Sequence, residues 1–179
     1  MPHARAEGAS LYYEETGRGL PIVFVHEFAA DLRSWEAQLR HFGRRYRCIA
    51  FNARGYPPSD VPTDPSLYGQ EHAADDIAAV LDHLGIERAH VVGLSQGGAA
   101  TLHFGLRHPR RAIGLVPTSA GSGATLSPAD RAAFIAGALA NADKLEAGGM
   151  PALVAEMTRA ANRMQLGVKA PRAWDEFAR

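Results

Sequence analysis

The sequence lacks the features that mark several classes of protein. It has one cysteine, Cys48, so no internal disulfide can form, and we expect a small buried side chain there rather than a reactive thiol. Its 19 basic and 19 acidic residues cancel, which argues against a nucleic-acid partner. No apolar run approaches the roughly 20 residues of a membrane span, and the N-terminus does not resemble a signal peptide. We therefore expect a cytoplasmic protein without membrane partners.

Metal and nucleotide motifs are also missing. No Walker A or G-x-G-x-x-G sequence occurs, and the pair His26-Glu27 begins like the zinc motif H-E-x-x-H but has Ala30 at its fifth position. His72, Asp75 and Asp76 have the spacing of one helix face, which we interpret as a solvated surface rather than a cation site. We expect neither a metal nor another cofactor.

The residues that are present predict an α/β protein. Apolar residues make up 46% of the chain, and a domain of this length buries roughly 70% of the surface of its unfolded chain. Short β-type runs alternate with helical patterns over the first 120 residues, which predicts a mainly parallel twisted sheet with helices on both faces. Alanine-rich helical patterns follow. We predict a core domain over residues 1–122 and a helical cap segment over residues 123–179.

The expected elements follow from apolar spacing and from glycine and proline. Strands are predicted over residues 11–15, 22–26, 47–51, 90–93 and 112–116, and helices over residues 35–42, 66–84 and 97–108. The first two strands are predicted to form a hairpin. Ser34 is expected to cap the first helix, Pro117 to break the last strand, and Ser127-Pro128 to begin the helical segment.

The segment 91–100 places the pattern G-x-S-x-G between a strand and a helix. A nucleophilic serine needs a sharp strand-to-helix turn to expose its hydroxyl, and that turn crowds the residues two before and two after it. Both of these are glycine, Gly93 and Gly97. The alternative is an ordinary glycine-rich turn with an incidental serine, but the strand before and the helix after favour Ser95 as a nucleophile.

From these residues the chain resembles the α/β-hydrolase family. Residues 22–28 are similar to the family's strand ending in His-Gly-x, residues 51–59 to its D-x-R-G-x-G-x-S loop, and residues 106–109 to the end of the helix after its nucleophile. The resemblance covers about residues 10 to 120.

The resemblance implies roles for particular residues. Ser95 would be the nucleophile, the backbone N–H groups of Phe28 and Gln96 would form the oxyanion hole, and His26 would occupy a structural position rather than act as the base. We predict that a substrate cleft is lined by His26, Glu27, Trp35 and Tyr56, with core packing as the alternative for the aromatic residues.

Two departures from the family pattern affect these roles. Glu27 replaces the family's glycine and adds a side chain beside the expected oxyanion hole. In this fold the triad runs Ser, then Asp or Glu, then His, but no histidine follows His108. His103 and His108 lie along the helix that Ser95 begins and cannot fold back to it. We therefore expect a truncated chain that stops within the cap.

The sequence leads to two functional hypotheses. The first is a hydrolase that acts on a small ester, lactone or similar carbonyl compound through an acyl-enzyme on Ser95. Loss of the triad histidine costs about 10⁶-fold in turnover, so the isolated chain should be nearly inactive. The second is a catalytically dead remnant or interaction module that pairs through its exposed edge strand, 112–116. Nothing in these residues chooses among esterase, lactonase, haloperoxidase and C–C hydrolase branches.

Overall fold

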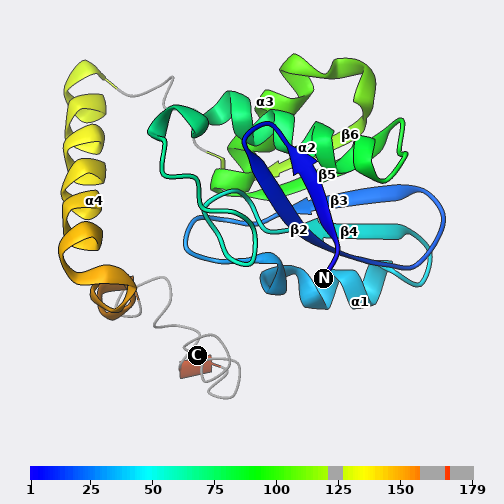
Figure 1. Cartoon of the computed structure of the whole chain (residues 1–179), viewed down its shortest axis with the longest axis horizontal. Helices are drawn as coiled ribbons and strands as arrows, with labels where there is room; N and C mark the ends of the chain where they lie inside the picture. Colours follow the sequence, from blue (N-terminus) through cyan, green and yellow to red (C-terminus); the bar gives the residue numbers. More distant parts are fainter. Residues whose placement is uncertain (121–126, 158–167, 170–179) are drawn as a thin grey trace. The chain divides into compact units, whose positions relative to one another are not determined.

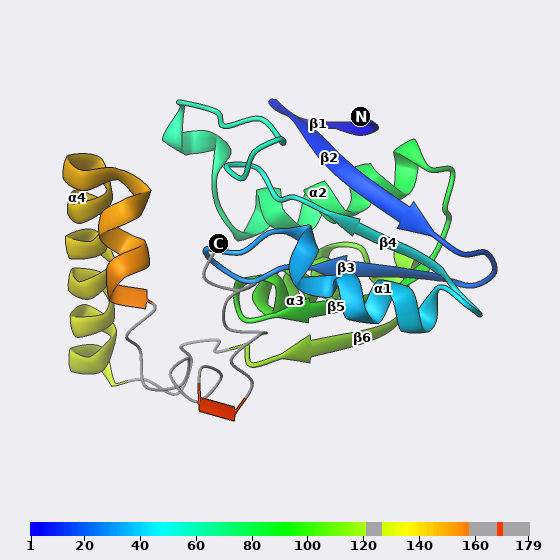
Figure 2. The same cartoon turned by 90° about the horizontal axis from the view of Figure 1, so that it is seen from below.

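A six-stranded sheet organises the first of two units in the computed structural model, which describes residues 1–120, 127–157 and 168–169 (Figures 1 and 2). The strand order is β1-β2-β4-β3-β5-β6. The strands are β1 (His3–Ala6), β2 (Ala9–Thr16), β3 (Pro21–Val25), β4 (Arg47–Phe51), β5 (Ala89–Leu94) and β6 (Ala112–Thr118). β1, β2 and β4 pair antiparallel, whereas β4, β3, β5 and β6 pair parallel, which confirms the predicted mainly parallel sheet.

Helices cover both faces of this sheet. They are α1 (Glu36–Phe42), α2 (Gln70–His83) and α3 (Gln96–Arg107), with 3-10 turns η1 (Leu32–Trp35), η2 (Pro65–Leu67) and η3 (Pro109–Arg111). Figure 1 shows α1 on one side of the sheet and α2 and α3 on the other. Val23 and Val25 of β3 pack in the core under α2 and α3, while Ile22 and Phe24 pack in the opposite core. A continuous apolar run results because successive side chains alternate between two buried faces.

The predicted hairpin between the first two expected strands is wrong. β4 lies between β2 and β3, and β2 forms its hairpin with β1 through Gly8, which has a φ of 69°. β3 lies between β4 and β5 and is buried along nearly its whole length, whereas the last three residues of β2 are exposed. Hydrophobic periodicity identified five of the six strands and missed β1, and it carries no information about which strands are neighbours.

Three predicted boundaries also differ from the structure. The helix predicted over residues 66–84 is divided: η2 ends at Leu67, and α2 begins at Gln70 and ends at His83. Asp31, not Ser34, caps the first helical segment, because its carboxylate accepts a hydrogen bond from the Arg33 amide at 2.8 Å. Pro117 does not break the last strand, which continues to Thr118. The Thr118 carbonyl accepts a hydrogen bond from the Ser95 amide, so the neighbouring Pro117 nitrogen faces away from β5 and its missing N–H interrupts no ladder bond.

The second unit, Gly123–Arg179, is described by itself. Its helix α4 (Pro128–Met157) begins as predicted: the Ser127 hydroxyl accepts a hydrogen bond from the Asp130 amide at 3.1 Å. α4 is two helices joined at a kink, since Gly149 has a φ of 63°. Further helices expected after residue 157 fall largely outside the described residues. Within the described ranges, no helix has the length and apolarity needed to cross a membrane.

Candidate active site

The turn between β5 and α3 holds Ser95 in a conformation that few side chains adopt. Its φ is 52° and its ψ is −110°, outside the ordinary regions for a residue with a Cβ atom. A Cβ atom on Gly93 would lie 2.1 Å from the Gly97 carbonyl oxygen, and one on Gly97 would lie 2.2 Å from the Val25 carbonyl oxygen. Both positions therefore require glycine, for the reason that the G-x-S-x-G spacing indicated.

Neighbouring hydrogen bonds fix this turn. The Ser95 amide donates to the Thr118 carbonyl at 2.9 Å, and the Thr118 hydroxyl donates to the Gly93 carbonyl at 2.8 Å. On the other side, the Thr101 hydroxyl donates to the Gly97 carbonyl at 2.8 Å. The turn is thus held from β6 and from the second turn of α3.

The Ser95 side chain is exposed at the beginning of α3. It does not cap the helix, and it forms no hydrogen bond within the described part of the chain. The first amides of a helix lack intrahelical acceptors and carry a partial positive charge. Within the described residues, the Ser95 hydroxyl therefore lies at these amides without a competing hydrogen-bond partner.

The segment after β3 passes beside this turn. Phe28 is 48% exposed, and Ala29 has a φ of 57°. The Ala29 amide donates to the Tyr56 hydroxyl oxygen at 3.3 Å, and the Glu27 carboxylate accepts a hydrogen bond from the Ser34 hydroxyl at 3.3 Å. The extra side chain at position 27 is therefore tied to η1.

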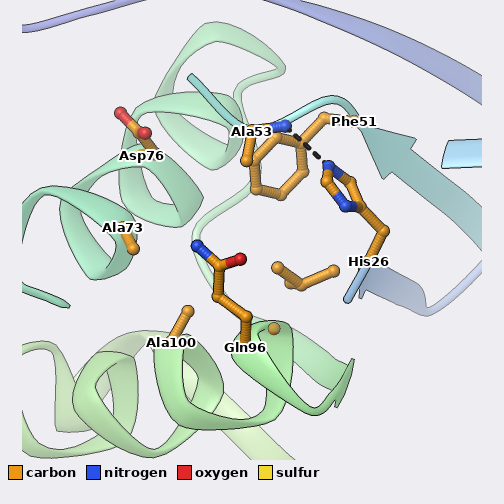
Figure 3. Close-up of a pocket in the computed structure, with 9 residues that line it drawn as sticks. His26, Phe51, Ala53, Ala73, Asp76, Gln96 and Ala100 are labelled. Carbon is orange, nitrogen blue, oxygen red and sulfur yellow. Dashed lines mark hydrogen bonds between the residues drawn. The ribbon is translucent and has the colours of Figure 1, made fainter. Parts of the chain in front are cut away.

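His26 is a buried neutral imidazole. Its Nε2 accepts a hydrogen bond from the Ala53 amide at 3.0 Å, so its Nδ1 carries the proton and donates to the Glu27 carbonyl at 2.8 Å (Figure 3). Burial lowers its pKa below the ordinary 6.5, against a smaller opposing effect of the Glu27 carbonyl. Because both ring nitrogens are engaged, His26 offers none to a substrate.

A small pocket lies beside the turn of residues 93–97 between β5 and α3, here called the elbow. It is enclosed by the ends of β3 and β4 and the helices α2 and α3 (Figure 3). Its lining residues are Val25, His26, Phe51, Ala53, Ala73, Asp76, Gln96, Gly97 and Ala100. Of the predicted cleft residues, His26 lines it, and Tyr56 reaches its edge by donating to the Gln96 Oε1 at 3.3 Å. Trp35 does not line the pocket. It packs against Phe24 in the core on the opposite face of the sheet, with the two ring centroids 5.1 Å apart.

Asp76 is the residue of this pocket that the sequence analysis misassigned. It is 1% exposed and forms a two-pronged ion pair with Arg54, at 2.8 Å to Nε and 2.6 Å to Nη2, so a solvated helix face is wrong for it. Burial raises the pKa of the Asp76 carboxyl, an effect that the hydrogen bonds from Arg54 partly offset. The one sequence signal for a buried acidic partner was Arg54, in the loop of residues 51–59.

The described residues contain no cluster of three or more His, Cys, Asp or Glu side chains arranged to hold a metal. Cys48 is fully buried as expected, and burial raises the pKa of its thiol.

Comparison with known proteins identifies what this arrangement is similar to. A sequence model of the family described as alpha/beta hydrolase fold matches residues 21–160. Epoxide hydrolase 2 of Siraitia grosvenorii is 34% identical over 113 residues, which cover 63% of this chain and 36% of that protein. 3-Oxoadipate enol-lactonase 1 of Acinetobacter baylyi is 32% identical over 134 residues, which cover 75% of this chain and 46% of that protein.

A solved structure agrees in fold. A thermophilic esterase from Thermogutta terrifontis superposes with a TM-score of 0.80 and 26% identity, covering 95% of this chain and 60% of the esterase. The chain spans less than half the length of the two curated relatives named above.

Proposed function

The chain belongs to the alpha/beta hydrolase fold family, and from this premise we propose that Ser95 is the nucleophile of a hydrolase acting on an ester, lactone or similar carbonyl compound. The observation that carries the proposal is the Ser95 geometry: an exposed hydroxyl on a strained, glycine-flanked turn at the beginning of α3. Its named relatives include a lactonase and an esterase, both of which cleave bonds to a carbonyl carbon.

The proposed reaction starts with attack of the Ser95 hydroxyl on the carbonyl carbon. A bond forms from the serine oxygen to that carbon, and the carbonyl π electrons move to its oxygen. The backbone N–H groups of Gln96 and Phe28 are the proposed donors to this oxyanion. Collapse of the adduct breaks the bond from the carbonyl carbon to the leaving oxygen, and the alkoxide takes up the proton that the Ser95 hydroxyl lost. Water then attacks the acyl carbon, which releases the acid and returns a proton to the Ser95 oxygen.

The proton of the Ser95 hydroxyl needs an acceptor, and the histidines of this sequence are poorly suited to the task. All eight precede residue 109. His26 has both ring nitrogens engaged, and His103 and His108 lie about 12 Å and 20 Å along the axis of α3 from Ser95. We therefore expect the isolated chain to turn over substrate slowly, with the oxyanion donors supplying most of the remaining rate acceleration.

Covalent labelling tests the proposal without requiring turnover. The chain is incubated with a fluorophosphonate, and the modified residue is identified by intact mass and peptide mapping. Because attack on the fluorophosphonate also requires loss of the Ser95 proton, we expect slow labelling that reaches one label per chain, on Ser95, and that the Ser95→Ala variant loses. Ser119→Ala is the matched control, because Ser119 is also exposed and also has a positive φ, of 50°, but the next residue, Ala120, is not helical.

Equal labelling of the parent chain and Ser95→Ala would contradict the proposal. The same is true if p-nitrophenyl acetate is hydrolysed at one rate by both proteins. Either result would favour the non-catalytic interaction module instead.

A further inference from the structure

One hydroxyl group connects the two segments that carry the proposed oxyanion donors. The Tyr56 oxygen accepts a hydrogen bond from the Ala29 amide at 3.3 Å and donates to the Gln96 Oε1, also at 3.3 Å. Ala29 directly follows Phe28, and Gln96 directly follows Ser95. A phenol can accept one hydrogen bond and donate another at the same time, so Tyr56 is a bridge between the β3 segment and the elbow.

Tyr56 stands on a tightly closed turn. The Tyr56 amide donates to the Ala53 carbonyl at 3.1 Å, and the Ser59 amide donates to the Tyr56 carbonyl at 3.0 Å. Asn52 braces the same turn through its side-chain amide, which donates to the Pro57 carbonyl at 2.8 Å. The Tyr56 ring also packs edge-on against the buried His26 ring, with centroids 4.7 Å apart. The backbone hydrogen bonds of the turn and the ring contact with His26 together fix the position of the Tyr56 hydroxyl.

The segment that carries Phe28 needs such a support. Ala29 adopts a φ of 57°, a conformation that costs a residue with a side chain about 1–3 kcal/mol unless surrounding contacts hold it. The Phe28 side chain is nearly half exposed and therefore anchors the segment weakly. Its polar anchors include the Ala29–Tyr56 bond and the bond from the Leu32 amide to Asn52 Oδ1 at 2.9 Å.

The same hydroxyl sets the orientation of the Gln96 side chain. Because Tyr56 uses its proton for the Gln96 oxygen, the Gln96 nitrogen is turned into the pocket. Figure 3 shows this side chain projecting from α3, with its nitrogen on the side of Ala73 and Asp76. Burial raises the pKa of the Tyr56 phenol, so it keeps this proton at neutral pH.

We infer that Tyr56 is a positioning residue that holds the Phe28 and Gln96 amides at a fixed spacing across the oxyanion site. The inference rests on the proposed function of Ser95. An oxyanion site works only when its donors converge on one point, and loss of a single donor costs about 10²–10³ in rate. Removal of the bridge loosens one donor rather than deleting it, so the expected loss is smaller, roughly 10- to 100-fold.

The test compares Tyr56→Phe with Tyr68→Phe. Tyr68 is a matched control, because its hydroxyl also makes a hydrogen bond to a neighbouring segment, the Pro62 carbonyl at 2.8 Å, but does not reach the elbow. Amide hydrogen exchange of peptides covering residues 27–32 measures whether the segment is held. The rate of Ser95 labelling by a fluorophosphonate measures the chemical consequence, and thermal melting reports general stability.

We expect Tyr56→Phe to speed exchange at Ala29 and to slow Ser95 labelling, while Tyr68→Phe behaves like the parent in both. Unchanged exchange at Ala29 would overturn the bridge. Faster exchange with an unchanged labelling rate would overturn its role in the oxyanion site. Slower labelling that occurs equally in Tyr68→Phe would reduce Tyr56 to a general structural residue. A parent chain that does not label at Ser95 defeats the proposed function itself, and this inference with it.

Discussion

At the scale of single residues, the pair of Arg54 and Asp76 is the most deeply buried of the described ion pairs. Their side chains are 5% and 2% exposed. Arg54 also donates to the Leu67 carbonyl at 2.6 Å and to the Glu7 carbonyl at 3.1 Å. One guanidinium therefore joins α2, η2 and the β1–β2 turn.

Asp76→Asn should destabilise the chain strongly. The substitution leaves the Arg54 charge buried without a counter-ion, which typically costs about 3–5 kcal/mol in unfolding free energy. The double variant Arg54→Met with Asp76→Leu removes both charges and should lose less. Urea denaturation of the parent chain and these two variants measures the difference in unfolding free energy.

The matched control for this prediction is Asp82→Asn. Asp82 pairs with Arg111 at 2.6 Å, but its side chain is 66% exposed, so the expected change is only about 0–1 kcal/mol. If Asp76→Asn were no more costly than Asp82→Asn, the buried pair would not stabilise the fold as argued.

Among the elements, the junction of β5 and α3 is closely packed. Gly97 packs against the end of β3, and Gly93 packs against the first turn of α3. The strand, the turn and the helix can approach this closely only because two side chains are missing. The G-x-S-x-G pattern and the tertiary packing therefore both require glycine at positions 93 and 97.

Gly97→Ala should both destabilise the first unit and reduce Ser95 labelling. The added methyl group would overlap the Val25 carbonyl oxygen, and overpacking of this kind costs about 1–3 kcal/mol. Gly137→Ala in α4 is the contrasting variant: nothing lies within 4 Å of its Cβ position, so it should gain up to about 1 kcal/mol of helix stability.

Thermal melting by circular dichroism, together with labelling, checks both variants. A Gly97→Ala chain that melts and labels like the parent would show that the elbow is looser than its geometry implies.

For the molecule as a whole, β6 is the element that bears on its association state. Among the described strands it pairs only with β5. Val116 is 48% exposed and Ile113 is 37% exposed, whereas the interior strands β3 and β4 are mostly buried. An apolar edge of this kind offers unpaired backbone groups to another chain.

We expect the chain to self-associate through β6. Light scattering should give a molecular mass that rises with concentration, and Val116→Lys should lower that mass because a charged edge resists pairing. Val61→Lys is the control, since Val61 is 54% exposed but lies in a loop. A parent chain that stays monomeric over the same concentrations would rule out this edge as an interface.

Local patterns in the sequence determine much of this protein. β3 and β4 were predictable because both of their faces are buried, which leaves an uninterrupted apolar run. The glycines at 93 and 97 were predictable because the turn they serve lies within five residues. Gly85, which directly follows the helix predicted over residues 66–84, was a predictable helix stop for the same local reason, and its φ is 63°.

Long-range contacts determine the rest. The insertion of β4 between β2 and β3, the burial of Asp76 against Arg54, and the bridge from Tyr56 to both Ala29 and Gln96 join residues 22 to 40 positions apart. Periodicity reports which face a residue occupies, but not what lies opposite. From the sequence, a charged residue on a helix is predicted to be exposed to solvent. Whether another segment buries it depends on the folded chain, because its environment is set by residues distant in the sequence.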